Sequence, residues 1–94
     1  MITYLKDHII EEISGAVDYM TKAVEHKGTH CGEIFYQMAN MELEHANALS
    51  KMMQKEEKPS SMTDAEYGAT QKAVLDAYTT HMPKIESMKK VYWA

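Results

Sequence analysis

The chain has 94 residues, enough for one domain with a modest core and too few for an enzyme that builds a cleft between two lobes. With 45% hydrophobic residues and only 4 Gly and 2 Pro, its composition is typical of a globular domain made of long helices. Its 14 acidic residues outnumber 10 basic ones and give a formal net charge of −4, which argues against a nucleic-acid partner.

The cysteine content and the N-terminal segment indicate a compartment. A single cysteine, Cys31, excludes an internal disulfide, so a reducing cytoplasm is the expected location. The N-terminal segment carries acidic residues where a signal peptide has an uninterrupted apolar core. No apolar stretch reaches the ~20 residues of a membrane span. We therefore expect a protein that is neither secreted by that route nor embedded in a membrane.

Apolar residues that recur every three or four positions predict three helices in a single domain. The first is expected over residues 2–27, the second over 33–56 and the third over 64–92. Gly28 lies between the first two and suits the left-handed position that commonly ends a helix. The predicted fold is therefore all-α, an antiparallel helical hairpin followed by a third helix.

Two local signals mark the third helix. Thr63 and Glu66 have the spacing of a capping box, which places its start near residue 64. Pro83 removes a backbone amide from the interior of the helix and is expected to bend or break it near His81.

Polar side chains interrupt the apolar seam of each of the first two helices. The inward positions are expected at Leu5, Ile9, Glu12, Ala16, Tyr19, Ala23 and His26, and at Phe35, Met38, Glu42, His45, Leu49 and Met52. If the chain reverses at Gly28, facing residues have numbers that sum to about 55, which puts Glu12 opposite Leu43. Glu12, Glu42 and His45 are then expected at one level of the hairpin.

These three side chains form a candidate metal site. Glu42 and His45 are three residues apart and leave the same helical face, with Glu12 across the gap. Two carboxylates and one imidazole suit iron or manganese, whereas structural zinc prefers cysteine or more histidine. The alternative is a buried salt bridge in which protonated His45 pairs with both carboxylates.

The candidate site is half of a known ligand set. Helical bundles that bind two irons or two manganese ions use a Glu from each of two helices and a Glu-x-x-His from each of the other two. The third helix cannot supply the rest, because none of its acids has a histidine three residues onward: Asp64, Glu66, Asp76 and Glu86. We therefore expect a two-fold homodimer, or a higher homo-oligomer built from dimers, around a pair of metal ions.

Between Ile9 and Leu49 the sequence resembles the ferritin-like superfamily. Within it, the chain is most similar to the encapsulated ferritins, short hairpin chains whose ferroxidase centre forms between two subunits. The resemblance rests on Glu11-Glu12 ahead of Ala16-Val17-Asp18-Tyr19, on Met41-Glu42-Leu43-Glu44-His45-Ala46, and on the spacing between the two segments.

The resemblance implies a ferritin-like four-helix bundle formed by dimerisation, with Glu12, Glu42 and His45 as iron ligands. It also implies that Tyr19 lies close to the centre and that Glu11 helps iron to approach. The implied activity is that of an oxidoreductase, a ferroxidase and iron-storage protein that oxidises Fe(II) to Fe(III) at a di-iron site.

The resemblance further implies an encapsulin shell as partner and a location inside an encapsulin nanocompartment. One departure bears on the shell, because Val91-Tyr92-Trp93-Ala94 shows no clear version of the peptide that directs family members to it. A second departure bears on an auxiliary iron-entry site, because Ser14 stands where family members usually carry a second acidic group.

Other functions stay open. A manganese catalase or a peroxide-reducing di-iron protein uses similar ligands, so manganese remains an alternative cofactor. A metal-free helical dimerisation protein would use the same three side chains as a buried polar network that sets register. The sequence assigns no role to His8, His26, His30, His81 or Cys31.

Overall fold

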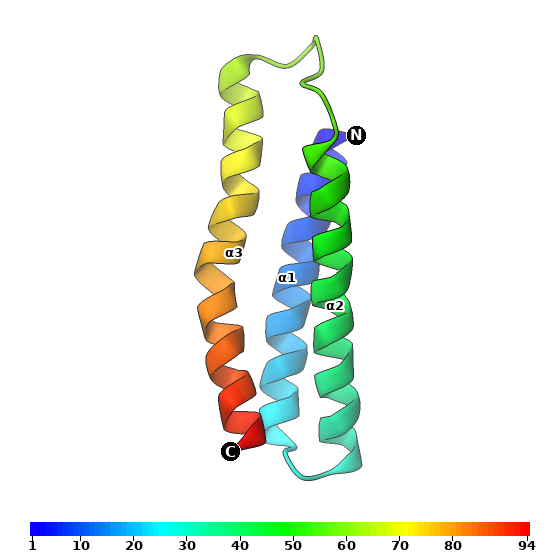
Figure 1. Cartoon of the computed structure of the whole chain (residues 1–94), viewed down its shortest axis with the longest axis vertical. Coiled ribbons are helices and arrows are strands. Elements are labelled where there is room, and N and C mark those ends of the chain that lie inside the picture. Colours follow the sequence, from blue (N-terminus) through cyan, green and yellow to red (C-terminus); the bar gives the residue numbers. More distant parts are fainter.

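The computed structural model describes residues 1–94 as three long helices (Figure 1). α1 spans Ile2–Glu25, α2 spans His30–Gln54 and α3 spans Asp64–Trp93. α1 and α2 form an antiparallel hairpin, and α3 runs beside α1 in the same direction as α1. The molecule measures 51 × 18 × 15 Å. The predicted all-α architecture, with a helical hairpin and a third helix, is confirmed.

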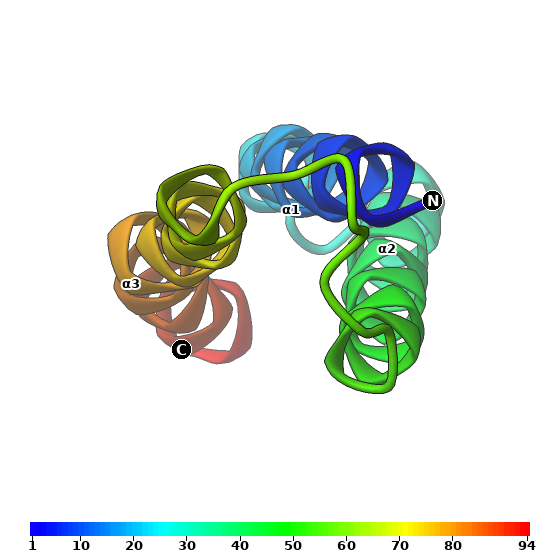
Figure 2. The same ribbon diagram turned by 90° about the horizontal axis from the view of Figure 1, so that it is seen from above.

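α1 occupies the corner of the arrangement. It packs along both α2 and α3, whereas the backbones of α2 and α3 stay apart, as the end-on view shows (Figure 2). Long side chains connect α2 to α3. The Tyr78 hydroxyl lies 2.9 Å from Asn47 Oδ1 and 2.9 Å from Ser50 Oγ, and Trp93 Nε1 donates to the Tyr36 hydroxyl at 2.8 Å. The third helix is therefore docked mainly on α1.

The hairpin turn is built from two glycines and a threonine. Gly28 has a φ of +83°, the left-handed conformation that the sequence predicts for it. The Thr29 hydroxyl caps α2 by accepting a hydrogen bond of 3.1 Å from the Gly32 amide, so α2 begins at His30 rather than at residue 33. Gly32 packs under the carbonyl of His26, where a Cβ would clash.

The core follows α1 from end to end. One cluster comprises Ile2, Leu5, Ile9, Ile13, Ala46, Met53, Val74 and Ala77. The other comprises Ala16, Met20, Ala23, Ala39, Leu43, Ile85 and Tyr92. Four alanines of α1 and α2 are fully buried in these clusters: Ala16, Ala23, Ala39 and Ala46.

The predicted seams are wrong by one residue at several positions. Ile13 and Met20 hold the innermost line of α1, while Glu12 and Tyr19 are half-buried and His26 is exposed. Along α2 the buried residues are Ala39, Leu43, Ala46 and Met53, whereas His45 and Met52 are exposed. α2 has apolar residues on two adjacent sides, and Ala39, Leu43 and Ala46 lie on the side that is buried. The predicted seam of α2 therefore lies beside the intramolecular contact.

The third helix starts as predicted but continues through its proline. The capping box of Thr63 and Glu66 is present, and Pro83 lies inside an unbroken helix. Pro83 is exposed and has no backbone N–H to donate to the carbonyl of Thr79. Thr79 is also exposed, so water can donate a hydrogen bond to this carbonyl. Ile85 and Tyr92 are buried beyond the proline and hold that part of α3 in place.

The other helix ends lie close to those predicted. α1 ends at Glu25 rather than at residue 27, α2 ends at Gln54 rather than at residue 56, and α3 ends at Trp93 rather than at residue 92. None of the three helices has a stretch long and apolar enough to cross a bilayer.

Candidate metal centre

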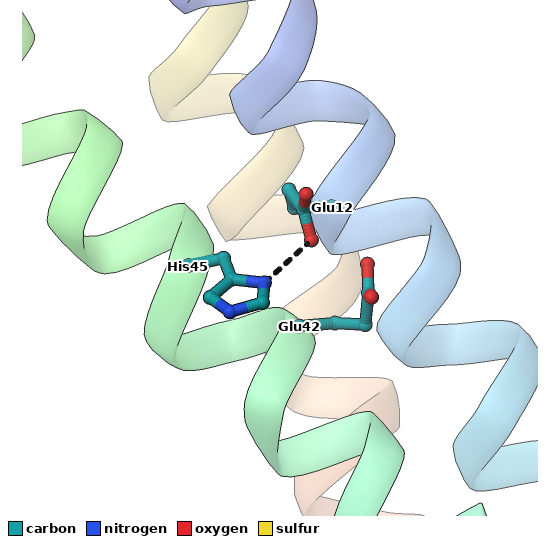
Figure 3. A group of neighbouring side chains, drawn as sticks. All are labelled: Glu12, Glu42 and His45. Atoms are coloured by element: carbon teal, nitrogen blue, oxygen red, sulfur yellow. Dashed lines mark ion pairs between the residues drawn. The ribbon is translucent and has the colours of Figure 1, made fainter.

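Glu12, Glu42 and His45 come together midway along the hairpin (Figure 3). Glu12 projects from α1, and Glu42 and His45 project from successive turns of α2. Ligand atoms from all three lie within 4.8 Å of one another. α3 lies behind the two helices in this view, so the group occupies the side of the hairpin that faces away from α3.

The Glu12 carboxylate is poorly compensated. Its Oε2 lies 3.5 Å from Nδ1 of His45, and the two side chains are 21% and 57% exposed respectively. That same Oε2 is buried and accepts no hydrogen bond. A buried carboxylate oxygen without a donor is costly, and a cation placed between Glu12 and its neighbours would remove the cost.

The two carboxyl groups also perturb each other. A side-chain hydrogen bond to Glu12 raises the pKa of Glu42 from 4.5 to about 7, and partial burial and the negative charge of Glu12 act in the same direction. The positive charge of His45 opposes the shift. A carboxyl group that keeps its proton close to neutral pH can exchange that proton for a metal ion.

The donor set determines which ions fit. Carboxylate oxygens together with one imidazole nitrogen suit Fe(II) or Mn(II). His45 is exposed enough to turn its ring nitrogens toward an ion. The group of three is the only cluster of three or more acidic, histidine or cysteine side chains in the chain close enough to share an ion.

Tyr19 lies outside this group. It is half-buried about two helical turns from Glu12, and its ring stacks on Phe35 with centroids 6.2 Å apart. Phe35 in turn stacks on His26 with centroids 6.0 Å apart. Tyr19, Phe35 and His26 therefore form an aromatic row that ends near the hairpin turn.

The remaining candidates are dispersed. Glu11 is exposed and does not join the group. His8 packs on Tyr4 with ring centroids 4.4 Å apart, and Nδ1 of His30 lies 3.9 Å from Oε2 of Glu33. None of these residues shares a site with Glu12.

Gly15 is a contributor that the sequence analysis missed. The Glu42 carboxylate lies directly against it, in space that a Cβ would occupy. The available signal was a glycine in the middle of a predicted helix, on the turn that follows Glu12.

A family model, rubrerythrin, matches residues 3–94, almost the whole chain. The chain belongs to the rubrerythrin family. No curated protein and no solved structure matches it. The family match confirms the predicted ferritin-like superfamily and extends it beyond Ile9–Leu49 to include α3. The narrower resemblance to encapsulated ferritins stays a prediction.

Rubrerythrin-family proteins are typically di-iron carboxylate proteins and are usually redox-active. In this chain, two carboxylates and one imidazole lie close enough together to hold a metal ion. These are the ligand types that a di-iron carboxylate site uses.

Proposed function

We propose that two copies of this chain enclose one di-iron site that oxidises Fe(II) to Fe(III). The observation that carries the proposal is the convergence of Glu12, Glu42 and His45 on one face of the hairpin, with a buried carboxylate oxygen that lacks a donor. Membership of a usually redox-active family supports the same reaction class.

The need for a second copy follows from the number of ligands. A ferritin-like di-metal site takes a Glu from each of two helices and a Glu-x-x-His from each of the other two. One chain offers Glu12 on α1 and Glu42 with His45 on α2. α3 packs on α1 away from this face and carries no Glu-x-x-His. A second copy related by a two-fold axis completes the set.

The surface around the ligands fits such a partner. We define the outer face as the side of the hairpin that carries the three ligands and faces away from α3. On α2, helical spacing places Met38, Leu49 and Met52 on it beside Glu42 and His45. Met38 and Leu49 are half-buried and Met52 is 52% exposed. These apolar side chains would be covered if two outer faces packed together.

The charges also balance in the dimer. Two copies bring four carboxylates to the axis, which two divalent ions would neutralise. Without metal those carboxylates repel one another, so metal binding and association are expected to be coupled.

The reaction is a two-electron oxidation. Two ferrous ions, bound as substrate, give one electron each to dioxygen, which takes up two protons and leaves as hydrogen peroxide while two ferric ions are released. Glu12 and Glu42 hold the ions close together and balance their charge, Glu42 gives up its proton as metal enters, and neutral His45 donates a nitrogen lone pair. Glu11, exposed beside Glu12, attracts ferrous ions, and Tyr19 lies on the aromatic row nearby.

The test replaces one ligand and one matched neighbour. Glu42→Ala is expected to abolish ferrous oxidation, followed as ferric absorbance and oxygen consumption, while helicity by circular dichroism is retained. Glu44→Ala is the control, because Glu44 is an exposed glutamate on the same helix outside the group. An active Glu42→Ala variant would contradict the proposal.

Two further arms separate the alternatives. Hydrogen peroxide in place of dioxygen distinguishes a peroxidase, and a manganese-loaded sample that disproportionates peroxide distinguishes a catalase. A chelator that leaves the oligomeric state and melting temperature unchanged would favour a metal-free dimerisation protein.

A further inference from the structure

Glu42 reaches the candidate centre by lying on the backbone of the neighbouring helix. A Cβ placed on Gly15 of α1 would lie 2.9 Å from Oε2 of Glu42, 3.5 Å from its Cδ and 3.8 Å from its Cγ. The first distance is shorter than real Cβ contacts show. The carboxylate therefore uses the space that every residue other than glycine would fill.

The backbone of α1 gives no other reason for this glycine. Gly15 lies in the interior of a helix, where glycine is about 1 kcal/mol less favourable than alanine. Gly28 is the one residue with positive φ, so Gly15 is not needed for a left-handed conformation. Its distinguishing contact is the Glu42 side chain.

We infer that Gly15 is a positioning residue, whose missing side chain lets the Glu42 carboxylate settle on α1 within metal-binding distance of Glu12 and His45. The inference rests on the proposed function, since it concerns the same metal ligands. It assigns to α1 a second part in the site, besides the Glu12 ligand.

A methyl group at position 15 would act on the ligand more than on the fold. Ordinary contact begins near 3.4 Å, so the Glu42 carboxylate would have to move by about half an ångström, and it is the free end of a flexible side chain. Displacements of about 0.5 Å are enough to spoil a metal site. The helix itself gains from alanine, so metal affinity and stability should change in opposite directions.

The experiment compares Gly15→Ala with Gly68→Ala. Gly68 is also a helical glycine, in α3, and a Cβ there meets nothing within 4 Å. The probe is ferrous iron added anaerobically to the full chain and followed by titration calorimetry. Thermal unfolding and molecular mass are measured on the same metal-free samples.

Gly15→Ala is expected to bind ferrous iron at least about tenfold more weakly than the wild type, with an equal or higher melting temperature. Gly68→Ala is expected to keep the wild-type affinity while its melting temperature rises. Wild-type affinity in Gly15→Ala, or a loss of affinity that accompanies lost helicity, would overturn the inference.

Failure of the proposed function has a different signature. If the wild type itself binds no iron, the shared site is wrong and the role of Gly15 toward metal falls with it. If the wild type binds iron and Gly15→Ala binds it equally well, only the positioning role is wrong. A nuclear Overhauser contact between Gly15 Hα and Glu42 Hγ in the metal-free protein tests the geometry directly, and its absence would also overturn the inference.

Discussion

At the scale of single residues, the proposed chemistry depends on Glu12 and Glu42. They lie across the α1–α2 contact, where Glu12 raises the pKa of Glu42, and one oxygen of Glu12 is buried without a donor. Such an arrangement is unfavourable in the metal-free protein at neutral pH and becomes favourable when a cation replaces the proton. Because the pair lowers the stability of the metal-free protein, its effect can be measured as a change in the free energy of unfolding.

The metal-free protein should lose stability as the pH rises. The pKa of Glu42 is about 7 in the folded protein against an ordinary value of 4.5 in the unfolded chain. Between these values the folded state holds a proton that the unfolded state has released, so the free energy of unfolding falls as pH increases. The stabilisation is complete below 4.5 and lost above about 7. Solvent screening limits the loss to about 1 kcal/mol.

Glu42→Gln should remove this dependence, because the amide can donate to Glu12 at any pH. Urea unfolding of chelator-treated protein at pH 5 and pH 8 measures it. Glu44→Gln is the matched control and should follow the wild type. A wild type that is more stable at pH 8 than at pH 5 would contradict the raised pKa of Glu42, provided that Glu42→Gln is equally stable at the two pH values.

At the scale of elements, α3 has the fewest buried residues of the three helices. They are Val74, Ala77, Ile85 and Tyr92, of which Tyr92 stacks on Tyr36 of α2. α3 also contains a proline that cannot donate a helical hydrogen bond. Its capping box and its packing on both sides of Pro83 keep it continuous.

Pro83→Ala should stabilise the protein. The ring is exposed, so little packing is lost, and the alanine amide restores a hydrogen bond to the Thr79 carbonyl. We expect a gain of about 1–3 kcal/mol, measured by urea unfolding. Pro59→Ala, in the connection between α2 and α3, should give no gain, because a loop proline restricts the unfolded chain. A lower stability for Pro83→Ala would mean that α3 depends on its proline.

Local sequence signals predicted where the helices begin and end better than they predicted how the helices pack. The turn at Gly28 and the cap at Thr63 depend on neighbouring residues, so the sequence predicts them directly. The level at which Glu12 meets Glu42 and His45 also follows from chain reversal at that turn. The face that each helix turns inward could not be predicted in the same way, because α2 has apolar residues on two adjacent sides and only one of them is buried. The role of Gly15 depends on a side chain from another helix.

At the scale of the whole molecule, the proposed dimer would cover the outer face, including apolar side chains of α2 that its contact with α1 leaves exposed. Met52→Lys should weaken association without unfolding the chain, because Met52 is 52% exposed in the single chain and would be covered in the dimer. We expect at least a tenfold weaker dimer by analytical ultracentrifugation, with unchanged helicity. Leu75→Lys, at a 64% exposed leucine of α3, is the control and should dimerise normally. Equal association of both variants would place the interface elsewhere.

The most direct test of the shared site is iron content and molecular mass on one sample. Protein loaded anaerobically with ferrous iron should contain about two irons in a species of two chains, and a chelator or Glu42→Ala should remove the iron and weaken the dimer. No iron above background, or iron bound by a single chain, would contradict a di-iron centre completed by a second copy.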